Sequence, residues 1–421
     1  MTFHKNMVIK FKDTAVSTIL LYVLLLTSVD TVIFGTNINR TFLYVPRIIG
    51  LLAIIVLPII KNKSVIRFKI NLKALLLVIT LIMIMLVSTI INSDNMVTFI
   101  SRAISVLVAY TICCVFSDKE YFKIFDNFMY LIAIISIIVE IVAYIFPAAF
   151  QILPTVTNTA NGLFYTFFFG SIQSIFLNVP LVRANGIFWE PGAFSIYLVF
   201  SIMIQFFIMN RPNIKRVVVY IVAIVITFST TGYIVLSFLF VAYLVSNRTT
   251  GMSKKLKRLL IVLFVALIFF VLFVEGDLVY STVFSKLTNG ASAATTRYSS
   301  FFNGIRVVFD HPVFGVASNT DYYMGQYVHA TGNMFANGGT IITNTIVGWS
   351  ANYGLVFGVI FVAGSLKCLY KHSQSKIEWV LISLAMFLAY FGEMFYSFFP
   401  LVFCFYGFIN RGVIDDENCR D

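Results

Sequence analysis

The chain has 421 residues, of which 59% are hydrophobic and 11% are charged, and its mean hydropathy is +0.92. This composition excludes a string of soluble domains and is typical of a polytopic membrane protein. The formal net charge is +12, but the basic residues form no patch interleaved with aromatic residues, so we expect no nucleic-acid partner.

Apolar runs of roughly 17–23 residues recur along the chain, each long enough to cross a bilayer as a helix. The sequence therefore predicts an all-α, polytopic transmembrane bundle in which 1–421 form a single integral membrane domain. We expect about twelve helices, near 15–34, 43–60, 74–91, 98–116, 124–146, 192–209, 215–230, 232–246, 259–274, 346–366, 378–395 and 397–410. The first run is followed by no small-residue cleavage site, so we interpret it as a permanent helix.

The distribution of basic residues predicts the orientation. With both termini in the cytoplasm, 23 of the 30 Lys and Arg residues lie inside, as the positive-inside rule requires. Seven are left outside: Arg40, Arg47, Arg102, Arg183, Lys286, Arg297 and Arg306. For Arg40 and Lys286 we expect headgroup contact. Arg47 and Arg102 lie within the outer turns of their helices, where a charge needs a partner or a ligand.

Two outer segments are long, about 147–190 and about 275–345, the second between helices 9 and 10. In the first, the aromatic run Leu163–Phe169 is too short to span, and we expect it to lie at the interface or to re-enter the bundle. In the second, Thr295–Phe309 has the apolar spacing of a helix lying against the membrane or the bundle. Arg297 and Arg306 then point to opposite sides, and both can bind one ligand only if this helix breaks, for example at Gly304.

The segment from Arg183 to Gly192 opens a mid-chain helix and holds the strongest candidate residues. Glu190-Pro191 is an ordinary helix start, since proline suits the first helical position; a catalytic role for Glu190 beyond this stays open. The sequence indicates no helix-capping role for Arg183, so we predict that this residue acts in the functional site itself. His311 and His329 are the outer histidines, and either could act as a base, although His311 beside Pro312 is expected to stabilise a turn.

The remaining motifs exclude several mechanisms. No nucleotide-binding phosphate loop is present, and the outer side has no dense set of carboxylates for a divalent metal, so we expect neither a metal nor another cofactor. If the site binds a diphosphate, arginines would have to stabilise its negative charge in place of a metal. Asp30, Glu140 and Glu393 lie near the outer helix ends, where carboxylates usually pair with arginine or line a polar cavity.

Several short motifs resemble the O-antigen ligase/polymerase superfamily of bacterial membrane glycosyltransferases. They are Arg183–Gly192, the run from Arg297 through Phe301 to Pro312 and Gly315, and the segment from Thr343-Asn344 to Gly354. The ligases of this superfamily carry a catalytic His where this chain has Thr343. This departure argues against ligation to lipid A core and favours the O-antigen polymerase.

The resemblance implies an inner-membrane enzyme acting on the periplasmic face. It would transfer a glycan from undecaprenyl diphosphate to the end of another carrier-linked repeat, without a metal, beside a chain-length regulator and a flippase in the same bilayer. Arg183 and Arg297 would stabilise the diphosphate, with Arg47, Arg102, Arg306 and His311 as further substrate-binding candidates. Glu190 or His329 would act as the base. A ligase and a lipid-linked oligosaccharide flippase are the alternatives; a structural scaffold explains neither the arginines nor the long loop.

Overall fold

The computed structural model describes residues 15–35, 40–62, 72–157, 162–174, 182–209, 211–246, 248, 293–320, 322–325 and 342–409. The helix predicted near 259–274 lies outside these ranges. The other apolar runs are helical over part or all of their length, but the predicted number of twelve helices is not confirmed. The described helices are Ala15–Leu26, α2 (Arg40–Asn62), α3 (Leu72–Ile91), α4 (Met96–Val115), α5 (Asp118–Ile145), α6 (Pro191–Met203), α7 (Ile214–Thr227), α8 (Thr230–Val245), α12 (Ala293–Asp310), α14 (Thr345–Tyr353), α15 (Leu355–His372), α16 (Lys376–Gly392) and α17 (Phe398–Phe408).

Five of the described helical segments are long and apolar enough to cross a membrane: α3, α4, α5, α6 with its π-helical continuation to Ile208, and α15. The outward faces of the bundle are also apolar. On α2, for example, Ile48, Ile55 and Ile59 are more than half exposed. Water does not favour such a surface but lipid does, so the fold fits a helical membrane protein.

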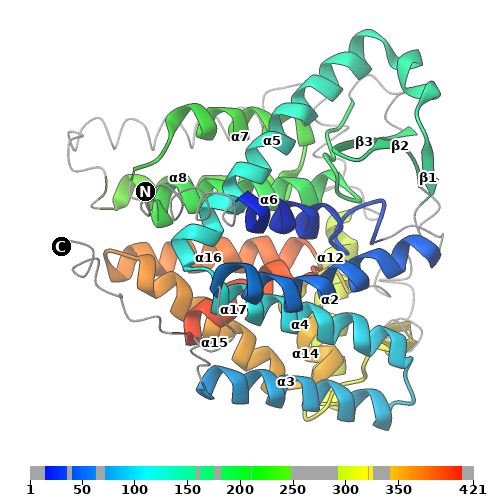
Figure 1. The fold of residues 1–421 in the computed structure, drawn as a ribbon, viewed down its shortest axis with the longest axis vertical. Helices are drawn as coiled ribbons and strands as arrows, with labels where there is room; N and C mark the ends of the chain where they lie inside the picture. Colours follow the sequence, from blue (N-terminus) through cyan, green and yellow to red (C-terminus); the bar gives the residue numbers. More distant parts are fainter. Residues whose placement is uncertain are drawn as a thin grey trace, which may run out of the picture.

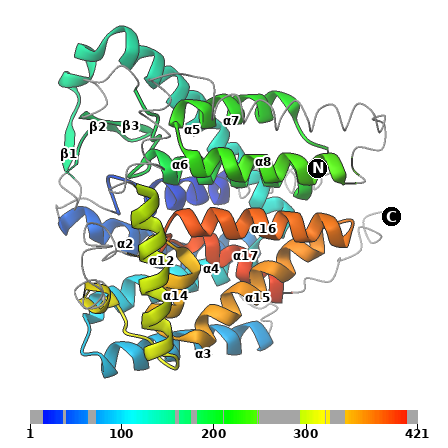
Figure 2. The same cartoon turned by 180° about the vertical axis from the view of Figure 1, so that it is seen from behind.

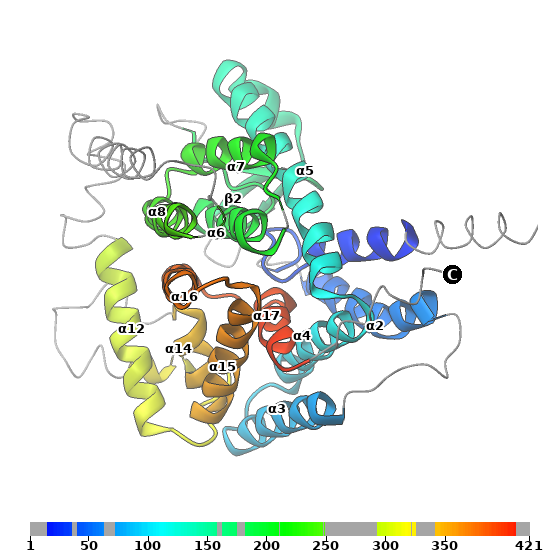
Figure 3. The same cartoon turned by 90° about the vertical axis from the view of Figure 1, so that its left-hand side faces the viewer.

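Helices α3, α4, α8 and α16 run in roughly the same direction, while α5 and α15 are inclined to them (Figures 1 and 2). Viewed along the bundle, α5 to α8 form one group, and α2 to α4 with α14 to α17 form another (Figure 3). The groups meet where α16 packs against α8, while α15 and α17 cross closely because Gly364 and Gly407 lack side chains at the crossing. One end of the bundle carries a small β-sheet (Figure 1). We call it the sheet end, and it holds the segments predicted to face outward.

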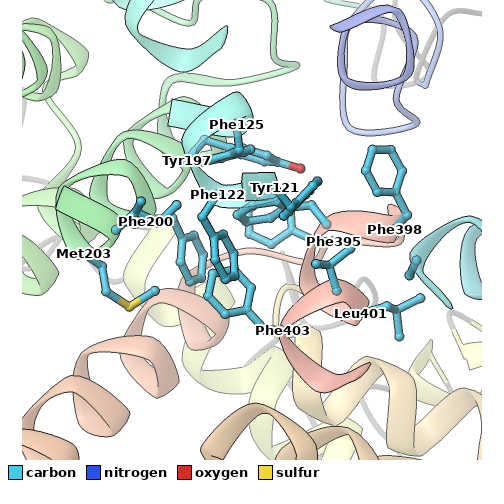
Figure 4. Close-up of a cluster of buried hydrophobic side chains, with 14 of the residues drawn as sticks. Tyr121, Phe122, Phe125, Tyr197, Phe200, Met203, Phe395, Phe398, Leu401 and Phe403 are labelled. Carbon is cyan, nitrogen blue, oxygen red and sulfur yellow. The ribbon is translucent and has the colours of Figure 1, made fainter. Parts of the chain in front are cut away.

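Aromatic rings fill the centre of the bundle (Figure 4). Phe125 of α5 stacks on Phe399 of α17 with ring centroids 4.3 Å apart, and Phe122 lies 4.8 Å from Phe403. Tyr197 of α6 joins this cluster through Phe399, at 4.9 Å. Every residue of α6 is buried, and this helix packs against α5, α7 and α8. Large rings in offset or tilted contact stabilise such a core beyond the burial of their area.

The prediction of an all-α fold is wrong for the first long loop. The prediction that Leu163–Phe169 lies at the interface or re-enters the bundle stays a prediction, but the segment is not helical. Leu163–Phe167 form strand β2, which pairs antiparallel with β1 (Thr155–Thr157) and β3 (Gly170–Gln173). Burial alternates along β2, with Phe164 and Thr166 buried, which is the period-two pattern of a strand covered on one face.

Two predicted helices are shorter or broken. The first ends at Leu26 instead of 34, and the chain then turns so that Thr31 forms a β-bridge with Phe188. The run predicted as one helix at 346–366 breaks at Gly354, whose φ of +87° is accessible to glycine at little cost. A side chain there would meet the Val313 carbonyl oxygen at 2.1 Å, so close backbone packing forces the break.

α12 crosses the bundle at the sheet end, roughly perpendicular to α8 and α16 (Figure 2). Its buried face, with Val307 and Val308, packs on Val347 of α14. The helix does not break at Gly304, where the sequence left a break open. Gly304 instead lets α14 approach, because a Cβ there would lie 2.6 Å from the Val347 side chain.

Candidate functional site

The predicted site residues lie at the sheet end but in separate environments. They are distributed over α2 (Arg47), α4 (Arg102), the segment before α6 (Arg183 and Glu190) and the end of α12 (Arg306 and His311). Arg297 belongs to α12, but its side chain lies outside the described part, as does the whole of His329. The environment of each described residue therefore decides which of them is available to a ligand.

A small hollow of about 30 Å³ lies at the sheet end between the helix Ala15–Leu26, α2, α4 and the start of α17. We call it the Arg47 hollow. Its polar lining consists of five hydroxyl residues and one arginine: Thr27, Ser28, Arg47, Ser101, Ser105 and Ser397. Leu24, Ile104, Val108 and Phe398 contribute apolar walls. Polar groups that converge between apolar walls are a feature of ligand sites, and a hollow of this size admits one small group of a ligand.

Arg47 is the residue that makes this hollow suitable for an anion. Its guanidinium lies over the Tyr44 ring, 5.2 Å from the centroid. Its Nε is buried, and no atom of the described residues accepts a hydrogen bond from it. An unsatisfied buried donor costs roughly 1–3 kcal/mol, more when charged, and an anionic oxygen in the hollow would remove that cost.

Asp30 forms a hydrogen-bonded cluster behind one wall of the hollow. The turn after the first helix buries its carboxylate, which accepts a hydrogen bond from the Tyr197 hydroxyl at 2.5 Å. The Tyr197 hydroxyl also lies 3.3 Å from that of Ser397, the residue before α17. Burial raises the pKa of Asp30 to about 6.

Arg102 has partners within the protein. Its Nη1 donates to the Tyr353 hydroxyl at 3.0 Å, and its guanidinium lies 4.0 Å from the centroid of the Tyr396 ring. The side-chain amide of Asn352 forms its full set of hydrogen bonds when its oxygen accepts from Arg102 Nη1 at 2.6 Å and its nitrogen donates to the Ala317 carbonyl. Arg102 thus joins α4, α14 and the segment before α17, which is a structural role that the sequence did not reveal.

The turn after α12 locks onto the break between α14 and α15. Leu355 N donates to the Pro312 carbonyl at 2.8 Å, and Val316 N donates to the Ala351 carbonyl at 2.9 Å. Gly315, with φ of +64°, packs so closely that a Cβ would lie 2.3 Å from the Ala351 oxygen. One contact region therefore contains Pro312, Gly315 and Gly354. These are three of the residues on which the family resemblance rests.

The expectation that Arg183 has no structural role at a helix end is wrong. Its Nε donates to the Thr227 carbonyl and its Nη2 to the Phe228 carbonyl, each at 3.1 Å. These carbonyls end α7, where the helix leaves acceptors without intrahelical donors. Arg183 therefore caps α7 from 44 positions away in the sequence, a contact that no local pattern predicts.

The other predicted residues have simpler environments. Glu190 is the residue before α6, with Pro191 at the first helical position, so the predicted helix start is confirmed. His311 follows α12, accepts a hydrogen bond from Gly315 N through its carbonyl, and contacts the Tyr323 ring at 4.8 Å, which agrees with a turn. Arg306 is exposed on α12. Thr343 donates from its backbone N to the Ser300 hydroxyl of α12 at 2.9 Å.

Sequence reasoning missed Ser397 and Tyr197 and gave Asp30 only a general role. The sequence held only weak indications of these residues. Asp30 is an acidic residue near the end of an apolar run, and Ser397 precedes a short apolar run. Within the described residues, no group of three or more His, Cys, Asp or Glu side chains could hold a metal ion.

No family model matches this chain, and neither a curated protein nor a solved structure matches it.

Proposed function

We propose that this protein polymerises lipid-linked glycan repeat units, such as those of O-antigen, at the sheet end of the bundle. A single observation carries the proposal: the buried Arg47 Nε lies in a hydroxyl-lined hollow and has no hydrogen-bond acceptor among the described residues. The planar fork of arginine matches the oxygens of a diphosphate, and serine and threonine hydroxyls add neutral donors. The leaving group of a polyprenyl-diphosphate donor has this chemistry.

The surface of α2 supports a lipid-linked ligand. Tyr44, Ile48, Leu52, Ile55 and Ile59 are each about half exposed or more and follow one side of the helix from the level of Arg47. A polyprenyl chain could lie along this apolar stripe while one oxygen of its diphosphate enters the hollow beside Arg47. Transfer would break the bond between the anomeric carbon and the diphosphate, and Arg47 would stabilise the negative charge that develops.

The resemblance to the ligase/polymerase superfamily gives the reaction class. Its support here is that Pro312, Gly315 and Gly354 lie in one region, where the turn after α12 packs on the break between α14 and α15. Thr343, which replaces the catalytic His of the ligases, has a hydroxyl 3.3 Å from that of Ser300 and offers no imidazole base. This favours the polymerase over the ligase. Glu190 stays a candidate base, and Arg297 and His329 stay candidates whose side chains the structure does not describe.

The proposal includes the membrane arrangement that the sequence predicts. About twelve helices would cross the inner membrane, with both termini in the cytoplasm and the sheet end in the periplasm. The substrates would be undecaprenyl-diphosphate-linked oligosaccharides. A flippase would supply them, and a chain-length regulator would act beside the polymerase.

The test is deletion of the gene, complementation with variants, and electrophoresis of the surface lipopolysaccharide. We expect core plus one repeat from the deletion, and the same from Arg47→Ala, because loss of a charged hydrogen bond weakens diphosphate binding roughly 10- to 100-fold. Arg47→Lys should restore only part of the ladder. Arg211→Ala, an exposed arginine at the opposite end, should restore all of it.

Two outcomes would contradict the proposal. An unchanged ladder in the deletion strain would exclude a polymerase, and loss of every repeat would indicate the flippase or the ligase. A full ladder from Arg47→Ala would exclude the hollow as the diphosphate site while leaving the polymerase intact.

A further inference from the structure

Helix α12 has a second apolar face that the described part of the bundle does not cover. Its first face packs on α14. On the opposite side Phe302 is 46% exposed, Phe309 is 72% exposed, and Arg306 is exposed between them. These residues are four and then three positions apart, so they follow one side of the helix. The same exposure continues in the turn that follows, where Val313 is 59% exposed. We call these four residues the α12 stripe.

The position of α12 places this stripe against lipid. α12 is roughly perpendicular to α8 and α16 (Figure 2), and seen along the bundle it lies at the edge, outside α14 and α16 (Figure 3). Since α8 and α16 run in roughly the same direction as the spanning segments α3 and α4, α12 lies parallel to the bilayer plane. Other rings are exposed at the same end: Tyr144, Phe146 and Phe168 are each more than 60% exposed. Aromatic residues gather at this depth in membrane proteins.

Arg306 gives the stripe an anion-binding group. No hydrogen bond or ion pair joins its guanidinium to another described residue, including Asp310, which is exposed one turn further along. A long basic side chain can extend its stem over apolar surface and place its charge among the headgroups. The planar guanidinium matches phosphate oxygens. The two phenyl rings on either side suit the acyl chains directly below those phosphates.

We propose that the α12 stripe lies in the bilayer leaflet at the sheet end, with Phe302 and Phe309 among the acyl chains and Arg306 bound to a phospholipid phosphate. The partner is a lipid surface, and an anionic headgroup is preferred because it adds net negative charge. This inference does not depend on the glycan chemistry, and it assigns Arg306 a ligand other than the substrate diphosphate. The contact sets the depth of the sheet end in the membrane.

The first measurement locates the stripe. The full chain is placed in vesicles of phosphatidylcholine and phosphatidylglycerol with a nitroxide label on Phe309→Cys. Collisions with oxygen, which concentrates in lipid, are compared with collisions with a water-soluble nickel chelate present on both sides. We expect oxygen to dominate, at a shallower depth than for Ile55→Cys, an exposed position within α2. Arg211→Cys, exposed before α7, should favour the nickel chelate. The wild type, labelled in parallel, gives the signal of the native cysteines.

The second measurement tests the phosphate contact. A fluorophore on Phe309→Cys is quenched by either phosphatidylglycerol or phosphatidylcholine that carries the quencher. We expect phosphatidylglycerol to be favoured ~fivefold beside the label, because one arginine near an anionic surface contributes about that factor. Arg306→Gln should bring the preference close to one, and Arg306→Lys, which keeps the charge, should retain most of it. Arg211→Gln is the matched control, an exposed arginine at the opposite end, and should leave the preference unchanged.

Four outcomes would overturn the inference. A label at position 309 that meets the nickel chelate more often than oxygen lies in water, and one that meets neither is covered by protein. An unchanged lipid preference in Arg306→Gln would remove the phosphate contact. Inorganic pyrophosphate that abolishes the preference, against sodium chloride of the same ionic strength, would assign Arg306 to a soluble diphosphate instead of a lipid.

Discussion

Replacing Arg102 tests whether this arginine binds a ligand, as the sequence indicated, or holds the bundle together, as its contacts indicate. Arg102→Met keeps the length of the side chain but removes its charge and donors. A hydrogen bond from a charged group, here to the Tyr353 hydroxyl, contributes ~1.5–3 kcal/mol. A desolvated guanidinium over an aromatic ring, here Tyr396 at 4.0 Å, adds ~1–2 kcal/mol. We therefore expect Arg102→Met to lower the free energy of unfolding by about 3–5 kcal/mol.

The assay is reversible unfolding in mixed detergent micelles as the fraction of denaturing detergent rises, followed by tryptophan fluorescence. Trp349 is a suitable reporter, because its ring lies 5.8 Å from that of Tyr353. A double-mutant cycle with Tyr353→Phe should give a coupling energy of about 1–2 kcal/mol, since the pair is in direct contact. Ile100→Ala, an exposed residue of α4, is the control and should change stability by less than about 0.5 kcal/mol.

A stability loss under about 1 kcal/mol for Arg102→Met, with no coupling to Tyr353, would refute this reasoning. It would restore Arg102 as a candidate for binding the diphosphate. Inorganic pyrophosphate binding to the folded variant gives the second measurement: it should be unchanged if Arg102 is structural.

Two further substitutions test the packing that positions the site. Gly354→Ala places a Cβ 2.1 Å from the Val313 oxygen at a φ of +87°, so we expect a loss of about 1–3 kcal/mol or more in the same unfolding assay. Gly325→Ala, with nothing within 4 Å of its Cβ, should be tolerated, and equal losses at both glycines would contradict the argument. Asp126→Ala removes the buried carboxylate that pairs with Arg216 and accepts from Gln205 and Tyr220 at 2.8 Å, so it should cost about 3–5 kcal/mol. Asp126→Asn should cost less, and a neutral result for Asp126→Ala would show that the network does not join α5, α6 and α7.

The sequence determined where most of the described helices lie, because hydrophobic run length and capping residues are local properties. Ser229 illustrates this: its hydroxyl accepts from Gly232 N at the predicted break between α7 and α8. The start of α6 at Pro191 and the amphipathic α12 were readable for the same reason. Local pattern failed at Leu163–Phe167, where an aromatic run became a strand because its neighbours supply pairing partners.

The tertiary structure alone decided what each arginine does. Arg102 hydrogen-bonds Tyr353, 251 positions away, and Arg183 hydrogen-bonds Thr227, 44 positions away. Both arginines therefore have partners within the protein that the sequence pattern did not indicate. Asp30 meets Tyr197 across 167 positions. The reason is physical: a buried charge takes its role from the donors and acceptors that folding places around it, and those come from distant segments. Among the arginines whose side chains the structure describes, Arg47 has a buried donor, its Nε, that no hydrogen bond satisfies.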